Sequence, residues 1–457
     1  MHPVEVRVAG GTKTAYRGML RVPIVRARPD SKPIGIDVWH FPAEPEVDAQ
    51  RLPLFRLFGG PGWGGYTPDS IDWEDDIAPF VAQGDLVVVG QRGIGQSDPH
   101  TSCDAFSSAP EGELSPAEWS AAVREQCAAC RAHWEAQGYD LTGFNVIEAA
   151  ADVDDVRRLL GFDKILLSGG SYGSHWAMTV LRQHPDIVER ALLHGMEGPN
   201  HTYDSPSGVL GALERIAAEA EASGALGGRV PEDGLIEGLR FVIDSIEGDP
   251  FEIDVDGELV PITAEGLRGL ALGVRHSVRS RRSVGGWPSD VIRLYEGEFE
   301  DAARALRGGE GGGLPTASFF QLDCGSGITR ERLERLQSDP ATAIVGDLSR
   351  FYEAACPAWD ADLGDDFRAD FTTAVPTLVV HGTWDVSTPF DNALELLHCF
   401  EQLHFVRVEG GTHGALGEAL RHDADFLSAV DAFLYEGDAS GLPDAVELPP
   451  IEWDAPR

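Results

Sequence analysis

Long apolar runs are missing from this chain: no stretch of 18 or more consecutive apolar residues occurs in its 457 residues. A transmembrane helix is therefore not expected. The first twenty residues also lack the basic start and apolar block of a secretory signal. The sequence therefore favours a cytoplasmic protein, unless a leader that preceded Met1 was removed.

Positive charge is scarce as well, with 36 Lys+Arg against 75 Asp+Glu and a net charge of −39. Such a surface repels phosphate backbones and anionic lipids, which argues against nucleic-acid and membrane partners. Lysine is almost absent; the only ones are Lys13, Lys32 and Lys164. A GC-rich genome or a salty habitat would explain this bias, and so would an acidic field that attracts cationic substrates.

Cysteine is infrequent, with six in the chain. Cys127 and Cys130 form a CxxC on an expected helix, but no second CxxC or paired histidine accompanies it, so no metal site is predicted. An even number of cysteines permits three disulfides, whereas a cytoplasmic location argues against them.

The length of the chain predicts a main domain with a large insertion or a second domain. We expect an α/β core over 1–199 and 371–457, with a mostly parallel sheet and helices on both faces, and a largely helical lid over 200–370. Core strands are expected at Val4–Val8, Leu20–Val25, Ile34–Phe41, Leu54–Phe58, Leu86–Val89, Lys164–Ser168, Ala191–His194, Thr377–His381 and His404–Val408. Core helices are expected at Asn145–Leu160, 172–184 and Ala424–Leu434. The lid includes a hairpin that turns at Asp256-Gly257 and a flexible loop at Arg307–Pro315.

The strongest motif is G-x-S-x-G at Gly169–Gly173, placed between a buried strand and a helix. Its flanking glycines let strand and helix approach closely, and the tight turn exposes the hydroxyl of Ser171. The N-terminus of the following helix offers backbone N–H groups to a developing oxyanion. This context predicts that Ser171 is a nucleophile.

A serine hydroxyl needs a base that a carboxylate holds in place. In this topology the acid and the histidine follow later strands, in that order. Asp385 follows the strand TLVVH, and His413 follows HFVRV within a glycine-rich loop. We predict these residues as acid and base, with Asp391 as the competing acid.

Residues 58–65, FGGPGWGG, directly follow a strand. Such a loop brings amides close to substrate and is predicted to supply half of an oxyanion hole, with the Tyr172 N–H as the other half. The sequence leaves open whether Gly60 or Gly62 donates. Trp63 of the same loop is a candidate substrate-binding residue. The loop lacks both the spacing and the lysine of a phosphate-binding loop.

The GGPG loop, the segment QRGIGQS at 91–97 and GGSYGSHWAMTVLRQHP at 169–185 resemble the proline-iminopeptidase and tripeptidyl-aminopeptidase branch of the α/β-hydrolases. The resemblance covers roughly residues 20–200 and 371–435. The chain departs from the pattern at Phe58, where many members have His, and at Gly90, where they have Asp. The segments around Cys324 and Cys356 resemble cysteine-bearing segments of secreted tripeptidyl members, which implies a disulfide between these two residues.

The resemblance implies release of residues from the free N-terminus of a peptide, which requires carboxylates that hold an ammonium group. Glu197, in HGMEGP, is the leading candidate, with Asp204 and Glu353 as helpers. The alternative for Glu197 is a structural residue at the junction of core and lid. No metal or organic cofactor is needed. Two other functions stay open: an esterase or amide/lactone hydrolase acting on a small metabolite, and an inactive binding module. Ser171 argues against epoxide hydrolases and dehalogenases, which use a carboxylate nucleophile.

Overall fold

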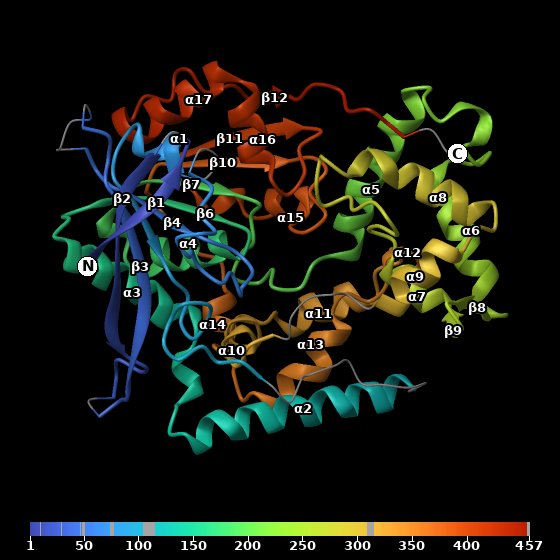
Figure 1. Cartoon of the computed structure of the whole chain (residues 1–457), viewed down its shortest axis with the longest axis horizontal. Coiled ribbons are helices and arrows are strands. Elements are labelled where there is room, and N and C mark those ends of the chain that lie inside the picture. The colour runs from blue at the N-terminus through green and yellow to red at the C-terminus, as the bar shows by residue number, and fades with distance from the viewer. Residues whose placement is uncertain are drawn as a thin grey trace.

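A computed structural model describes residues 1–9, 11–28, 30–45, 47, 51–73, 77–103, 115–308 and 315–454. Its centre is a ten-stranded sheet in the order β1-β2-β3-β5-β4-β6-β7-β10-β11-β12 (Figure 1). The strands are β1 His2–Val8, β2 Gly11–Pro23, β3 Pro33–Phe41, β4 Leu54–Leu57, β5 Leu86–Val89, β6 Ile165–Gly170, β7 Val188–His194, β10 Thr377–Gly382, β11 Leu403–Glu409 and β12 Ala445–Glu447. From β5 to β12 every neighbouring pair is parallel, whereas β1, β2 and β3 are antiparallel.

Helices cover both faces of the parallel part. α3 (Val146–Leu160) and α4 (Tyr172–Gln183) pack on one face, and α1 (Ala78–Val81), α16 (Ala415–His422) and α17 (Ala424–Asp431) pack on the other. Along β6, Leu167 belongs to the first apolar layer and the adjacent Leu166 to the second. Because both faces are covered, apolar residues follow one another along inner strands such as β5, which reads LVVV, rather than alternating with polar ones.

The segment between β7 and β10 is largely helical. It contains α5 Pro206–Ala222, α6 Leu235–Glu247, α7 Ala264–Gly269, α8 Trp287–Tyr295, α9 Glu300–Gly308, α10 Ala317–Ser326, α11 Arg330–Gln337, α12 Thr342–Val345, α13 Arg350–Ala355 and α14 Asp365–Arg368. It also contains the hairpin of β8 Phe251–Val255 and β9 Glu258–Ile262. Asp256 and Gly257 both have positive φ, as the predicted two-residue turn requires.

This inserted segment divides between two apolar cores. α5 to α9 and α12 share a core of their own, which lies to one side of the sheet (Figure 1). α10 and α13 instead pack into the core of the sheet, near α2 (Pro116–Ala136). The domain boundaries at 199/200 and 370/371 therefore stay a prediction, because part of the expected lid shares the core of the main domain.

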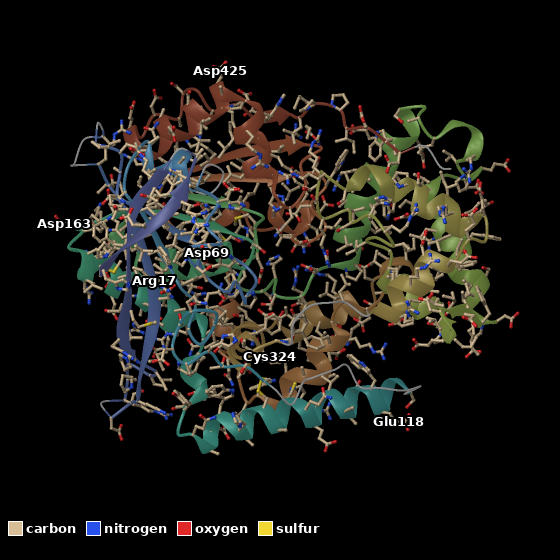
Figure 2. All side chains as sticks on the ribbon, in the orientation of Figure 1. Arg17, Asp69, Glu118, Asp163, Cys324 and Asp425 are labelled. Atoms are coloured by element: carbon tan, nitrogen blue, oxygen red, sulfur yellow. A yellow bond between two sulfur atoms is a disulfide. The ribbon has the colours of Figure 1, made fainter. Side chains whose placement is uncertain are left out.

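Two disulfides connect Cys103 with Cys130 and Cys324 with Cys356; Figure 2 labels Cys324. The pair implied by the resemblance, Cys324 with Cys356, is confirmed. The sequence left open whether the cysteines pair, and the argument against disulfides from a cytoplasmic location does not hold for these four cysteines. Cys127 of the CxxC is a buried free thiol, as is Cys399. The partner of Cys130 is thus a distant cysteine and not its near neighbour.

Other differences are local. The second strand begins at Gly11 and not at Leu20, because it pairs along its whole length with β1 or β3. The C-terminal tail contributes β12, which the sequence did not indicate. Residues 309–314 of the expected flexible loop lie outside the described residues. Within the described part of the chain, no helix combines the length and apolarity needed to cross a membrane.

Candidate active site

Ser171 occupies the turn between β6 and α4 with φ of 57°, a strained value for a residue with a side chain. The glycines of the motif make this turn feasible. A Cβ on Gly169 would lie 2.2 Å from the carbonyl oxygen of Gly173, and a Cβ on Gly173 would lie 2.2 Å from that of Leu57. Strand and helix therefore approach each other only because both positions lack side chains.

Asp385 and His413 lie on the loops after β10 and β11. Both carboxylate oxygens of Asp385 are 3.0 Å from Nδ1 of His413. The Asp385 carboxylate also accepts the backbone N–H groups of Ser387 and Thr388 at 2.9 and 3.0 Å, and the Thr388 hydroxyl at 2.8 Å. These bonds fix the carboxylate and leave Nε2 of His413 without a carboxylate partner.

The competing acid, Asp391, lies elsewhere. Its carboxylate forms an ion pair with Arg215 at 3.0 Å, and its side chain is 49% exposed. Asp385 is 1% exposed. Of the two candidates, the structure brings only Asp385 to His413.

Charge and burial act against each other at this pair. Burial raises the pKa of Asp385, but the charge and hydrogen bond of His413 outweigh it and hold that pKa well below its usual range. Burial lowers the pKa of His413, but Asp385 outweighs it and the net pKa is raised. Burial, with the charges of Arg56 and His413, lowers the pKa of the neighbouring His194 to about 3, and the charge of Asp385 opposes this only in part.

Ser171 and His413 line the same cavity, which has a volume of about 270 Å³. A Cβ on Gly195 would lie 3.2 Å from Cε1 of His413 and 3.4 Å from the backbone nitrogen of Ser171. The imidazole ring and the serine turn therefore meet at one point. The other lining residues come from the glycine loop, the segment between β7 and α5, the inserted helices α10 and α13, and the loop after β10. They are Gly60, Pro61, Glu197, Thr202, Asp204, Asp323, Tyr352, Ser387 and Thr388.

The glycine loop is held by Gln91 of the QRG segment. The Gln91 amide donates to the carbonyl oxygens of Phe58 and Gly59 at 3.0 and 2.8 Å and accepts the N–H of Gly62 at 2.9 Å. The amide of Gly62 is therefore already used inside the loop. Gly60, in contrast, lines the cavity.

Of the other two residues predicted for this region, Tyr172 lies beside the nucleophile and Trp63 lies outside the cavity lining. Tyr172 opens α4, so its N–H is one of the unpaired N-terminal donors of that helix. The structure does not bring Trp63 into the cavity lining: the ring stacks on Phe58 at 3.9 Å and contacts Tyr66 edge-on at 5.0 Å. Trp63 packs the loop onto the core.

Three carboxyl groups face the cavity: Glu197 after β7, Asp204 before α5 and Asp323 on α10. Burial, with the charges of the other two acids, raises the pKa of Glu197 well above its usual value. Burial raises the pKa of Asp323 in the same way and that of Asp204 to about 7. Three buried carboxyl groups, each with a raised pKa, thus share one cavity with Ser171.

Asp323 and Tyr352 are the site residues that the sequence did not indicate. The Tyr352 hydroxyl donates to Oδ2 of Asp323 at 2.9 Å, whereas Oδ1 is buried and has no hydrogen-bond partner among the described residues. Tyr352 also stacks on Tyr203 at 4.3 Å. Glu353, the expected helper, is exposed and is not part of the cavity lining. The resemblance had nevertheless pointed to the segment of Asp323 through Cys324.

Comparison with known proteins agrees with this architecture. Residues 57–219 match the family model described as "alpha/beta hydrolase fold", and residues 343–444 match the model "TAP-like protein". A proline iminopeptidase of Neisseria gonorrhoeae is 26% identical over 145 residues, which are 32% of this chain and 33% of the relative. The match thus spans about one third of the length of that curated relative.

Solved structures resemble this chain with TM-scores below 0.5. Est816, titled an N-acyl homoserine lactone degrading enzyme, has a TM-score of 0.35 and 16% identity, and covers 87% of this chain and 97% of its own. The epoxide hydrolase VrEH1 of Vigna radiata has a TM-score of 0.38 and 14% identity, and covers 92% and 98%. These scores indicate nothing about function.

The sheet order, the serine turn and the family models define the class: the chain has the α/β-hydrolase fold. Within that class it resembles the proline-iminopeptidase and TAP-like branch.

Proposed function

We propose that this hydrolase is a serine aminopeptidase that releases residues from the free N-terminus of short peptides through an acyl-enzyme on Ser171. The observation that carries the proposal is the placement of Glu197, Asp204 and Asp323 in one cavity with Ser171. Buried carboxyl groups with raised pKa values and an unpartnered oxygen are stabilised by a cation. The ammonium group of a peptide N-terminus supplies that cation.

In the proposed reaction, Nε2 of His413 takes the proton of the Ser171 hydroxyl as its oxygen attacks the scissile carbonyl carbon. Asp385 accepts the Nδ1–H of His413 and stabilises the imidazolium. The N–H groups of Tyr172 and Gly60 are proposed to stabilise the oxyanion.

His413 then returns the proton to the leaving amine as the C–N bond breaks. Water, activated by the same imidazole, cleaves the acyl ester and restores the hydroxyl of Ser171. The fit of the amino group in the carboxylate cluster would set which peptide bond lies at the hydroxyl. The likeness to proline iminopeptidases supports this reading.

The test compares chromogenic aminoacyl anilides with free and acetylated N-termini. We expect at least an about hundredfold preference in kcat/KM for the free amine, because an acetylated substrate leaves the buried acids without a cation. Asp323→Asn should raise KM about tenfold for the free substrate and leave the acetylated one unchanged. Glu353→Gln is the matched control, since its exposed side chain lies outside the cavity. Equal rates on both substrates would refute the proposal, and much faster turnover of simple acyl esters would favour the esterase or lactone hydrolase.

The two disulfides also bear on location. Disulfides persist in oxidising compartments and are rare in the cytosol. We propose on this basis that the chain works outside a reducing cytoplasm.

A further inference from the structure

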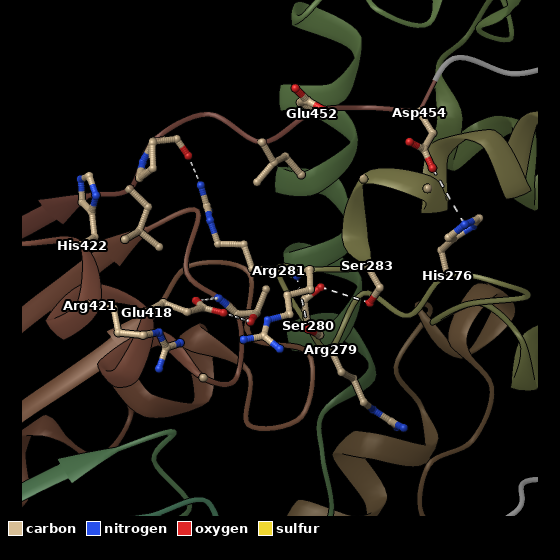
Figure 3. A pocket seen from close by; sticks show the side chains of 18 residues that line it. His276, Arg279, Ser280, Arg281, Ser283, Glu418, Arg421, His422, Glu452 and Asp454 are labelled. Carbon is tan, nitrogen blue, oxygen red and sulfur yellow. Dashed lines mark hydrogen bonds and ion pairs between the residues drawn. The ribbon is translucent and has the colours of Figure 1, made fainter. Parts of the chain in front are cut away.

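A second cavity, of about 860 Å³, lies on the other side of the loop that carries His413 (Figure 3). Residues 276–286 of the inserted segment form one wall, and Thr412, Gly414 and α16 form the opposite wall. Because Thr412 and Gly414 flank His413, which lines the cavity of Ser171, a single short loop borders both cavities.

Arginines with no counter-ion gather at this second cavity. Arg279, Arg282 and Arg421 line it, and within the described residues their guanidinium groups have neither an ion pair nor a hydrogen bond. Most other arginines of this chain are paired, as expected where 75 acids face 36 bases. Three free guanidinium groups at one cavity therefore form a local positive field in an acidic molecule.

The acids of the cavity are outnumbered. Its lining holds four arginines, Arg279, Arg281, Arg282 and Arg421, against three acids, Glu418, Glu452 and Asp454. The carboxylate of Glu418 accepts the hydroxyl and the backbone N–H of Thr412 at 2.6 and 2.9 Å, which holds it on the His413 loop. Glu452 and Asp454 belong to the C-terminal segment, and in Figure 3 they lie across the opening from Arg279 and Arg421. The carboxylate of Asp454 is 3.9 Å from Nε2 of His276.

Arg279 and Arg282 stand on a wall that hydrogen bonds hold in place, and Arg421 stands on α16. The guanidinium of Arg281 donates to the carbonyl oxygens of Gly410, on the His413 loop, and Pro449, on the C-terminal segment. The hydroxyl of Ser283 donates to the carbonyl oxygen of Ser277 at 2.7 Å and closes the 277–283 turn. Residues 276–286 are therefore tied to the His413 loop, which fixes the backbone that carries Arg279 and Arg282.

Arg279 connects the two cavities electrostatically. Its charge lowers the pKa of both Asp204 and His413, opposing the larger effects of burial on Asp204 and of Asp385 on His413. The geometry agrees, because Arg279 lines the cavity that Thr412 and Gly414, the two neighbours of His413, also line.

We propose that Arg279, Arg282 and Arg421, the arginine pocket, bind a carboxylate in the leaving part of the peptide, normally its C-terminus. The inference rests on the proposed aminopeptidase function and adds a specificity to it. The buried acids take the ammonium end, Ser171 attacks in between, and the arginine pocket takes the opposite charge. Guanidinium groups suit this task because their fork of N–H donors matches a carboxylate.

The arrangement selects for size as well as charge. An extended peptide spans roughly 3.3–3.6 Å per residue, so only a short peptide places its two charged ends in the two cavities at once. The preferred substrates are therefore oligopeptides with both ends free, and not the N-termini of folded proteins.

The experiment uses peptides of three to six residues in matched pairs, one with a free C-terminal carboxylate and one amidated. We expect the wild-type kcat/KM to be about tenfold or more higher for the acid at the best length, mainly through KM. In R279Q/R282Q/R421Q the acid-to-amide ratio should fall to about one. Arg124→Gln is the control, because Arg124 is exposed on α2 and also has no partner within the described residues, yet it lies far from the pocket in sequence and is not among its lining.

Each outcome is decisive. A wild-type ratio near one, with both peptides cleaved, overturns the arginine pocket and leaves the aminopeptidase intact. A ratio that persists in the triple variant also overturns it. Cleavage of acyl esters but of neither peptide refutes the aminopeptidase and the pocket together. A third peptide, amidated but ending in glutamate, distinguishes recognition of an acidic side chain from recognition of the terminal carboxylate. If this peptide is cleaved faster than the other amide, the arginine pocket binds either kind of carboxylate at that position.

Discussion

Gly59 lies directly against Ser171: a Cβ on Gly59 would sit 2.6 Å from the Cβ of Ser171 and 3.1 Å from its Oγ. The Gln91 side chain clamps Gly59, and the strained turn fixes Ser171. Because both backbones are held in place, the Ser171 hydroxyl has room only if residue 59 has no side chain.

Gly59→Ala should therefore displace the serine turn and lower kcat by about a hundredfold, the cost of a misplacement of roughly 1 Å, with little change in fold. Turnover and the rate of labelling by a fluorophosphonate measure the effect. Gly64→Ala is the control, because the nearest heavy atom to a Cβ there is 4.0 Å away. An unchanged labelling rate in Gly59→Ala would contradict the argument.

Asp385→Asn should lower kcat on the order of 10⁴-fold, because the amide no longer stabilises the His413 imidazolium or fixes its tautomer. Asp391→Asn, which removes an exposed partner of Arg215, should leave kcat within about twofold, as surface substitutions usually do. Steady-state kinetics on one ester substrate distinguishes the two acids. A large loss in the Asp391 variant would transfer the role to that residue.

The pH dependence follows from two groups with raised pKa values. His413 must be neutral to act as base, and Asp204, with a pKa of about 7, must be ionised to hold an ammonium group. The kcat/KM for peptides should therefore rise with pH through about 7. It should fall again above about 8, where the peptide amine loses its proton.

Asp204→Asn separates these two contributions. The charge of Asp204 helps to raise the pKa of His413, so the variant should shift the acid limb of an uncharged ester substrate to lower pH. A pH–rate profile on that ester checks this, and an unshifted acid limb would contradict the coupling between the two groups.

The disulfides predict a definite pattern of thiols. Digestion without reduction should yield Cys103–Cys130 and Cys324–Cys356 peptides, with Cys127 and Cys399 alkylated only after unfolding. Loss of the Cys103–Cys130 bridge, which spans 27 residues, should lower the free energy of unfolding by about 3 kcal/mol, the cost of a freer unfolded chain. Chemical denaturation of Cys103→Ser measures this. A Cys127–Cys130 peptide in the digest would contradict the structure.

Much of this site was visible in the sequence because its chemistry is local. Ser171 is marked by its own glycines, and Asp385 and His413 each follow a recognisable strand. The sheet and its helical insertion were predictable for the same reason, since apolar runs and glycine turns are read over a few residues.

Asp323 was not visible, because its role depends on how the helices of the inserted segment fold back over the sheet. Its neighbours in α10 carry no motif, and its partner Tyr352 comes from a different helix. Glu353 was expected instead, but one step along α13 turns its side chain to solvent. The disulfide of Cys130 was not predictable for a similar reason. Its partner Cys103 lies 27 residues away, whereas the sequence pattern pairs Cys130 only with the nearby Cys127.

One bridge has a consequence for the working enzyme. Cys324 directly follows Asp323, and Cys356 directly follows α13, which carries Tyr352. The bridge thus fastens the proposed amine-holding acid to its hydroxyl partner, whereas the nucleophile, acid and base stand on loops that it does not join. A reductant should therefore lower the preference for substrates with a free amine before it lowers the rate of hydrolysis. Substrate selectivity, and not turnover, would then depend on the redox state of the surroundings.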